Sequence, residues 1–205
     1  MTNKLTTLTL AALLGTAAVP AMAQSKGDFT LGFGVHSVTP DSSDSVTAVG
    51  RIDVDANIRP TLTAEYFLAD NLGVELLVAW PFEHDINLVG TGEVAKTKHL
   101  PPTLSLQYHF ANRSSFTPFV GAGVNYTYFF DDRGVGPLAG TAVDLDNSWG
   151  FALHAGLDYA ISERGSLRVD MRYIDIETDV KIGGAPVGKV KIDPWVFGVA
   201  YVHKF

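Results

Sequence analysis

Hydrophobic residues alternate with small or polar residues along most of this chain. The C-terminal segment shows this most clearly, with one apolar face made by Trp195, Phe197, Val199, Tyr201 and Phe205. A period of two residues indicates a β-strand. The same alternation recurs in seven earlier segments, whose apolar faces span 29–35, 58–66, 74–82, 100–110, 120–130, 149–159 and 167–173. The pattern therefore predicts an all-β chain of eight strands.

The connections between these strands alternate in length. Three are tight and polar: Ala69 to Asn71, Ala111 to Ser115 and Ser162 to Ser166. Four are long: 37–56, 84–98, 131–147 and 177–190. Outer-membrane barrels have short periplasmic turns and long extracellular loops. This rhythm predicts an eight-stranded antiparallel transmembrane β-barrel in the outer membrane of a Gram-negative cell, with both termini on the periplasmic side.

A soluble barrel would alternate in the same way, so the choice depends on what occupies each face. The less apolar face is rich in glycine, including Gly32, Gly34, Gly121 and Gly123, which indicates a narrow interior rather than a solvated exterior. The apolar face carries aromatic residues toward the strand ends, as girdles at membrane interfaces do: Trp80, Phe82, Tyr126, Tyr128, Phe130, Trp149, Phe151, Tyr201 and Phe205. Lipid is thus the expected outer solvent.

The first 23 residues have the features of a secretory signal peptide. Lys4 precedes an apolar run from Leu8 to Val19, and the segment ends in Ala21-Met22-Ala23. We therefore expect residues 1–23 to be a signal peptide and residues 24–205 to form the barrel.

Composition excludes several classes of function. The 22 acidic residues exceed the 15 basic ones, giving a net charge of −7, and there is no cysteine. Nucleic acid is not an expected partner, because binding phosphates needs a basic face. Thiolate metal sites and a cysteine nucleophile are ruled out. The six histidines show no metal-site spacing, so neither a metal nor a cofactor is expected.

Several motifs together resemble the outer membrane protein W (OmpW) family. They are Asn71 to Leu77, His99 to Leu104, Phe119 to Thr127, Ser148 to Gly150 and Asp193 to Phe197. The resemblance implies an eight-stranded barrel whose lumen passes or binds small apolar molecules and releases them sideways into the membrane. It implies no catalytic residues.

Strand parity places charged residues on the inner face, more than a hydrophobic conduit would need. The candidate channel-lining or gate residues are Glu75, Leu77, Phe119, Phe129, Arg168, Asp170, Arg172 and Ile174. Buried charges persist when they are paired. One interpretation is a plug of mutually paired charges that needs no ligand, and the other is a gate or selectivity filter.

Prolines within strands remove a ladder hydrogen bond. Pro81, Pro101 and Pro102 are candidates for a lateral opening in the wall, although they could instead mark bulges or strand ends near the rim.

Two other classes of function remain open at this point. One is a plugged structural or receptor barrel whose loops contact phage, bacteriocin or host. The other is a lipid-modifying enzyme using His36 with Ser37 or His84 with Asp85, which we disfavour because adjacent strand residues point to opposite faces. The expected partners are membrane lipid, small apolar ligands and the outer-membrane assembly machinery, which would read the C-terminal Phe205.

Overall fold

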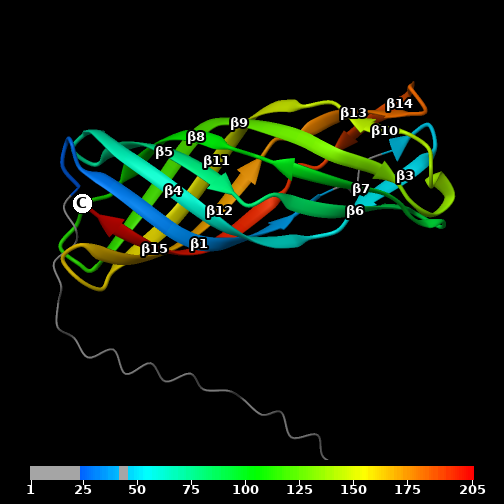
Figure 1. The fold of residues 1–205 in the computed structure, drawn as a ribbon. Helices are drawn as coiled ribbons and strands as arrows, with labels where there is room; N and C mark the ends of the chain where they lie inside the picture. Colours follow the sequence, from blue (N-terminus) through cyan, green and yellow to red (C-terminus); the bar gives the residue numbers. More distant parts are fainter. Residues whose placement is uncertain (1–23, 42–45) are drawn as a thin grey trace, which may run out of the picture.

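A computed structural model describes residues 24–41 and 46–205, so the expected signal peptide lies outside the described residues. The chain forms a barrel (Figure 1) from β1 (Phe29–Thr39), β4 (Asn57–Ala69), β5 (Leu72–Ala79), β8 (Thr103–His109), β9 (Phe116–Gly134), β11 (Ser148–Ala160), β12 (Gly165–Ile174) and β15 (Trp195–Lys204). Each strand pairs with the next in antiparallel register, and β15 pairs with β1 to close the ring. The predicted eight-stranded antiparallel barrel is confirmed.

Closure leaves every strand of the barrel with two neighbours, which is what a bilayer requires of a sheet, because hydrocarbon cannot satisfy a free edge. The wall is apolar outside and polar inside. Phe33 and Val124 are more than half exposed on the outer face, whereas Glu65 and Arg172 are buried inside. Inward glycines leave room for the polar side chains: a Cβ at Gly73 would meet the Glu65 carboxylate, and one at Gly198 would meet the His36 ring.

Aromatic side chains mark both ends of the apolar belt. Trp80, Trp149 and Trp195 are exposed at one end, and the other carries Phe29, Tyr66, Tyr108, Phe110, Phe116 and Phe205. The prediction that Phe82 belongs to these outer aromatics is wrong, because its ring is buried inside. The strand is interrupted between β5 and β6 at Trp80-Pro81, and the alternation of faces shifts by one residue there.

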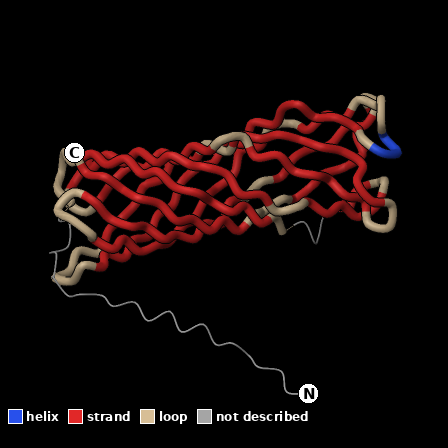
Figure 2. Tube along the Cα trace, turned by 60° about the horizontal axis from the view of Figure 1, so that its bottom comes forward, coloured by secondary structure: helices blue, strands red, loops and turns tan. Residues whose placement is uncertain are grey.

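The tight connections are at the end of the barrel that holds the C-terminus, which we call the turn end (Figure 2). Asn71, in the turn between β4 and β5, has a φ of 64°, a left-handed conformation that asparagine tolerates well. The N–H of Phe205 donates to the carbonyl of Phe29, so the last residue is fastened beside the first barrel strand.

The long connections are mostly β-structure rather than irregular loops. They extend the barrel at the end opposite the tight turns (Figure 1). This extension consists of β2 (Val46–Thr47), β3 (Gly50–Val54), β6 (Phe82–Leu88), β7 (Gly92–Leu100), β10 (Val143–Leu145), β13 (Glu177–Ile182) and β14 (Ala185–Lys191), with the 3₁₀ turn η1 (Gly136–Leu138). We call this end the loop end. Apolar residues such as Ile52, Phe129 and Val190 are buried inside it, so these segments pack a core of their own beyond the membrane belt.

One strand belongs to both the barrel wall and the loop end. β9 pairs with β8 in the barrel wall and with β7 in the loop end. Among the described residues, no helix is long and apolar enough to span a bilayer.

Candidate functional site

A cluster of buried charges fills the middle of the lumen. We call it the charge plug; it consists of Glu65, Glu75, Asp158, Asp170, Arg168 and Arg172. Strand parity aims all six side chains inward, and each residue is at most 6% exposed. Charges removed from water in this way are tolerated only when they are paired.

Arg168 holds one half of the plug together. Its Nε and Nη2 donate to the two carboxylate oxygens of Asp158, at 2.7 and 2.9 Å, and its Nη1 donates to Glu75 at 2.7 Å. The guanidinium carbon lies 4.4 Å from the centre of the Phe119 ring, within the range of a cation–π contact.

Arg172 holds the other half. It is fully buried, with Nη1 2.8 Å from Glu75 Oε1 and Nε 2.7 Å from Asp170 Oδ2. Asp170 also lies 3.2 Å from His36 Nε2. Glu75 therefore connects the two arginines, and a change at one of them reaches the whole plug.

Neutral polar groups complete the plug on its Glu65 side. The Gln107 amide donates to Glu65 at 3.1 Å, and its oxygen lies 2.8 Å from His154 Nε2. His109 Nε2 lies 2.9 Å from Glu65. The sequence does not predict Gln107 as a member of the site, because a glutamine on the inner face cannot be distinguished from other polar lining residues until its partners are known.

The predicted lining residues fall at three levels. Glu75, Arg168, Asp170, Arg172 and Phe119 meet in the plug. Leu77 is buried one inward position beyond Glu75 on β5, Ile174 belongs to the apolar core of the loop end, and Phe129 lines the cavity described next. Two further cations of the barrel strands are not part of the plug. Arg59 donates to the carbonyl of Pro81, and Lys204 pairs with Asp28 near the turn end.

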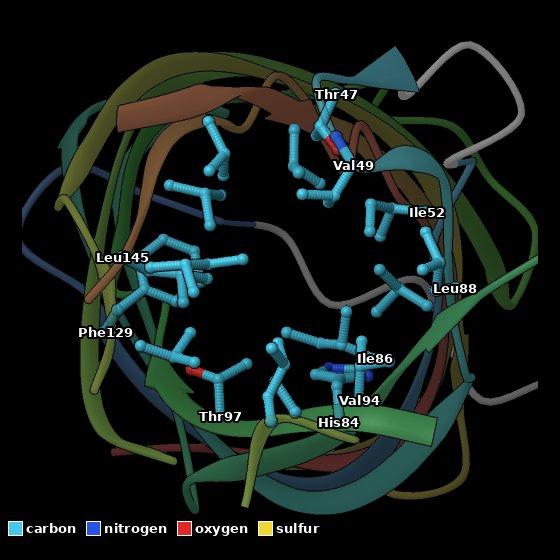
Figure 3. Close-up of a pocket in the computed structure, with 18 of the residues that line it drawn as sticks. Thr47, Val49, Ile52, His84, Ile86, Leu88, Val94, Thr97, Phe129 and Leu145 are labelled. Atoms are coloured by element: carbon cyan, nitrogen blue, oxygen red, sulfur yellow. The ribbon is translucent and has the colours of Figure 1, made fainter. Parts of the chain in front are cut away.

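An apolar cavity of about 120 Å³ lies inside the loop end. Figure 3 shows Ile52, Leu88, Phe129 and Leu145 projecting into it from different sides of the surrounding strands. We call it the loop-end cavity. Its lining comes from the long connections, which the alternation of strands and turns predicts to be loops. The sequence contains a sign of this β-structure, because Phe82, His84, Ile86 and Leu88 continue the two-residue period of a strand into the second long connection.

Two histidines line this apolar cavity. His84 and His99 are 2% and 1% exposed, and their rings stack at 4.9 Å with an interplanar angle of 11°. Burial lowers the pKa of His99 to about 3, with a contribution from His84 beside it. Burial also lowers the pKa of His84. Both rings are therefore neutral at pH 7.

The wall is interrupted where the membrane belt meets the loop end. The β5–β8 ladder stops at Leu77 opposite Thr103, and the β6–β7 ladder starts at Phe82 opposite His99. Within the described chain, residues 78–81 and 100–102 are not paired with each other. We call this interval the strand break. It holds all three predicted prolines, and Phe82 and His99 adjoin it on the loop side.

The carbonyls of the paired prolines are satisfied from inside. Asn125 Nδ2 donates to Pro101 at 3.1 Å and to Pro102 at 3.2 Å, and the N–H of Tyr126 donates to Pro102 at 3.0 Å. β8 thus stays attached to β9, while its other edge lacks ladder bonds at the break.

The acidic residues of the third long connection are engaged by cations and donors. Asp131 pairs with Lys98 at 2.6 Å, and Asp146 pairs with Lys181 at 2.9 Å. Across residues 24–41 and 46–205 there is no group of three or more metal-ligating side chains that could hold an ion.

Comparison with known proteins gives a consistent result. The OmpW family model matches residues 25–205. Outer membrane protein W of Vibrio cholerae is 40% identical over 210 residues, covering 96% of this chain and 97% of that protein. The crystal structure of the outer membrane protein OprG from Pseudomonas aeruginosa superposes with a TM-score of 0.78 at 34% identity, covering 90% of this chain and 99% of the other.

A more distant relative has a name that points to a metabolic setting. The dibenzothiophene metabolism operon protein PahQ of Pseudomonas aeruginosa is 26% identical over 189 residues, covering 86% of this chain and 88% of that protein.

Proposed function

This chain belongs to the OmpW family of Gram-negative outer-membrane β-barrels, and we propose that it takes up small apolar molecules at its loop end and releases them sideways into the outer membrane. The observation that carries the proposal is the position of the loop-end cavity, which lies between the cell exterior and the strand break and beyond the charge plug. A molecule leaving the cavity meets either paired charges or an unpaired stretch of wall.

The charge plug disfavours an axial path for an apolar molecule. Passage toward the turn end would separate Arg168 and Arg172 from their carboxylates, and breaking a buried ion pair costs about 3–5 kcal/mol. The strand break has no such barrier, because parting residues 78–81 from 100–102 breaks no ladder hydrogen bond between them.

Binding in the cavity needs no energy source. Burial of apolar surface is favourable by roughly 25 cal/mol per Å², so a small hydrocarbon can bind transiently and then partition into lipid. The name of PahQ, which mentions dibenzothiophene, an apolar ring compound, fits a substrate of this kind.

The first test is uptake of a small apolar probe into liposomes bearing the refolded barrel, with empty liposomes as the baseline. Leu100 lies within the strand break, and Leu104 is half exposed just beyond it on β8. Leu100→Arg with Leu104→Arg places two charges at the lipid side of the exit, and we expect uptake to fall to the baseline. The matched control is Leu153→Arg with Val169→Arg, on an intact ladder between β11 and β12, which should keep its uptake.

A second test closes the exit reversibly. Because the chain contains no cysteine, Val78→Cys with Leu100→Cys gives one unique pair across the strand break. A short cleavable thiol crosslinker should stop uptake, and its cleavage should restore it. Uptake by the unmodified barrel no faster than by empty liposomes would refute transport and leave the plugged structural or receptor barrel. Acyl transfer from phospholipid in the same vesicles would instead indicate the lipid-modifying enzyme.

A further inference from the structure

The loop-end cavity is apolar almost throughout, yet two imidazoles form part of its wall. Figure 3 shows His84 at the edge of the cavity, in the same part of the view as Ile86 and Val94. His99 stacks on it, and the edge of Phe129 packs against His99 with ring centres 5.6 Å apart. Aliphatic or aromatic side chains would pack here without polar atoms, so packing alone does not account for the two imidazoles.

The hydrogen bond to Asp55 determines which nitrogen of His84 carries the proton and which one can accept. Its Nδ1 lies 2.5 Å from the carbonyl oxygen of Asp55, which can only accept, so Nδ1 carries the proton. In the neutral ring Nε2 is then an acceptor. This atom is buried and has no hydrogen-bond partner within the described part of the chain.

His99 has both a hydrogen-bond donor and a hydrogen-bond acceptor without a partner among the described residues. Its Nδ1 and Nε2 are buried, and neither is hydrogen-bonded to any described residue. A neutral imidazole has one N–H donor and one acceptor. Together the pair presents two acceptors and one donor beside an apolar cavity, and buried polar groups of this kind are normally satisfied.

The charged groups near the pair are engaged with other residues. The Asp55 carboxylate accepts from Asn87 Nδ2 at 3.5 Å, the Arg59 guanidinium donates to the carbonyl of Pro81, and the Asp85 carboxylate pairs with Lys96 at 2.7 Å. The hydroxyl of Thr97, which also lines the cavity, donates to Asp132.

We propose that the loop-end cavity selects apolar molecules that carry one hydroxyl group, with His84 and His99 binding the hydroxyl and the aliphatic lining holding the rest. A hydroxyl can donate to His84 Nε2 and accept from the His99 N–H, which pairs two of the three unused nitrogens. A carboxylate would face the His84 lone pair and lose its hydration, and a hydrocarbon would leave all three nitrogens unpaired. This inference rests on the proposed function, because it names the class of molecule that the cavity takes.

The size of the cavity agrees with a small alcohol or phenol. Its volume of about 120 Å³ is close to that of an engineered cavity of about 150 Å³ that binds benzene. A single substituted ring fills such a space, and its polar group would then reach the wall.

The experiment compares three probes of one shape, toluene, 4-methylphenol and 4-methylbenzoate, binding to the full barrel in lipid nanodiscs. The quantity measured is the preference for 4-methylphenol over toluene, compared between variants, because partition into lipid then cancels. We expect His84→Leu with His99→Phe to reduce this preference about tenfold, which is about 1.4 kcal/mol, while toluene still binds. We expect no saturable binding of 4-methylbenzoate to the unmodified barrel.

Ile86→Ala is the matched control, since Ile86 lines the same cavity without a polar atom. It should weaken toluene and 4-methylphenol by the same factor. A readout that needs no variant is the ¹⁵N NMR signal of labelled histidine in the unmodified barrel, where 4-methylphenol should shift the imidazole resonances and toluene should leave them nearly unchanged.

The outcomes separate the two proposals. If toluene binds and the preference is the same in the barrel with and without the two histidines, the hydroxyl site is refuted and apolar uptake stands. If 4-methylphenol binds without moving the imidazole signals, the site is likewise refuted. If no probe binds the unmodified barrel, both proposals fail.

Discussion

The substitution Arg172→Met tests whether paired charges hold the barrel interior together. Methionine keeps most of the side-chain length but has no charge. The change leaves Asp170 with His36, 3.2 Å away, and Glu75 with Arg168, 2.7 Å away. Two buried carboxylates then each lose an arginine partner, and breaking a buried pair in this way costs about 3–5 kcal/mol. We expect the free energy of unfolding to fall by that amount.

The assay is urea unfolding of the barrel in lipid vesicles, with folded protein measured by its shifted gel mobility. The control is Lys189→Met, which removes an ion pair with Glu177 that is just as short, at 2.6 Å, but has a lysine side chain 59% exposed. Exposed pairs contribute about 0–1 kcal/mol, so the two variants should differ clearly.

A double variant checks the electrostatic origin of the loss. Arg172→Met with Asp170→Asn removes one of the stranded carboxylates together with its partner and should recover at least about 1 kcal/mol of the loss. If Arg172→Met is as stable as Lys189→Met, or if the double variant is no better than the single one, the plug does not stabilise the barrel by charge pairing.

Three further changes test other parts of the molecule. Gly198→Ala puts a Cβ against the His36 ring, so it should lower the free energy of unfolding in urea by about 1–3 kcal/mol; an unchanged midpoint would contradict a filled lumen. Acidification should loosen the loop end. The pKa of His99 is about 3 when folded and near 6.5 when opened, so below pH 6.5 only the opened state gains the proton, and the opening free energy of β7, measured by hydrogen exchange corrected for intrinsic rates, should fall by about 2 kcal/mol at pH 5. Deletion of Phe205 should slow insertion by the assembly machinery in cells but leave refolding in detergent intact, and equal insertion rates would refute its role as an assembly signal.

The alternation of single residues was enough to identify the barrel. Each strand has one face toward lipid and one toward a crowded interior, so parity alone assigned Glu75, Arg168 and Arg172 to the lumen. The same rule gave the wrong side for Phe82, because the interruption at Trp80-Pro81 shifts the period by one residue, and a sequence pattern does not reveal such a shift.

What the sequence could not give is which inner residues meet. Glu75 and Arg168 are 93 positions apart, and their contact depends on β5 and β12 facing each other across the closed barrel. The loop-end cavity is a product of assembly in the same way, since its lining comes from four separate connections. Parity is a local property set by the geometry of one strand, whereas partners are set by closure, register and the packing of segments far apart in the chain. For this reason the sequence determined the barrel and its inner face, and only the tertiary structure decided the plug, the cavity and the histidine pair.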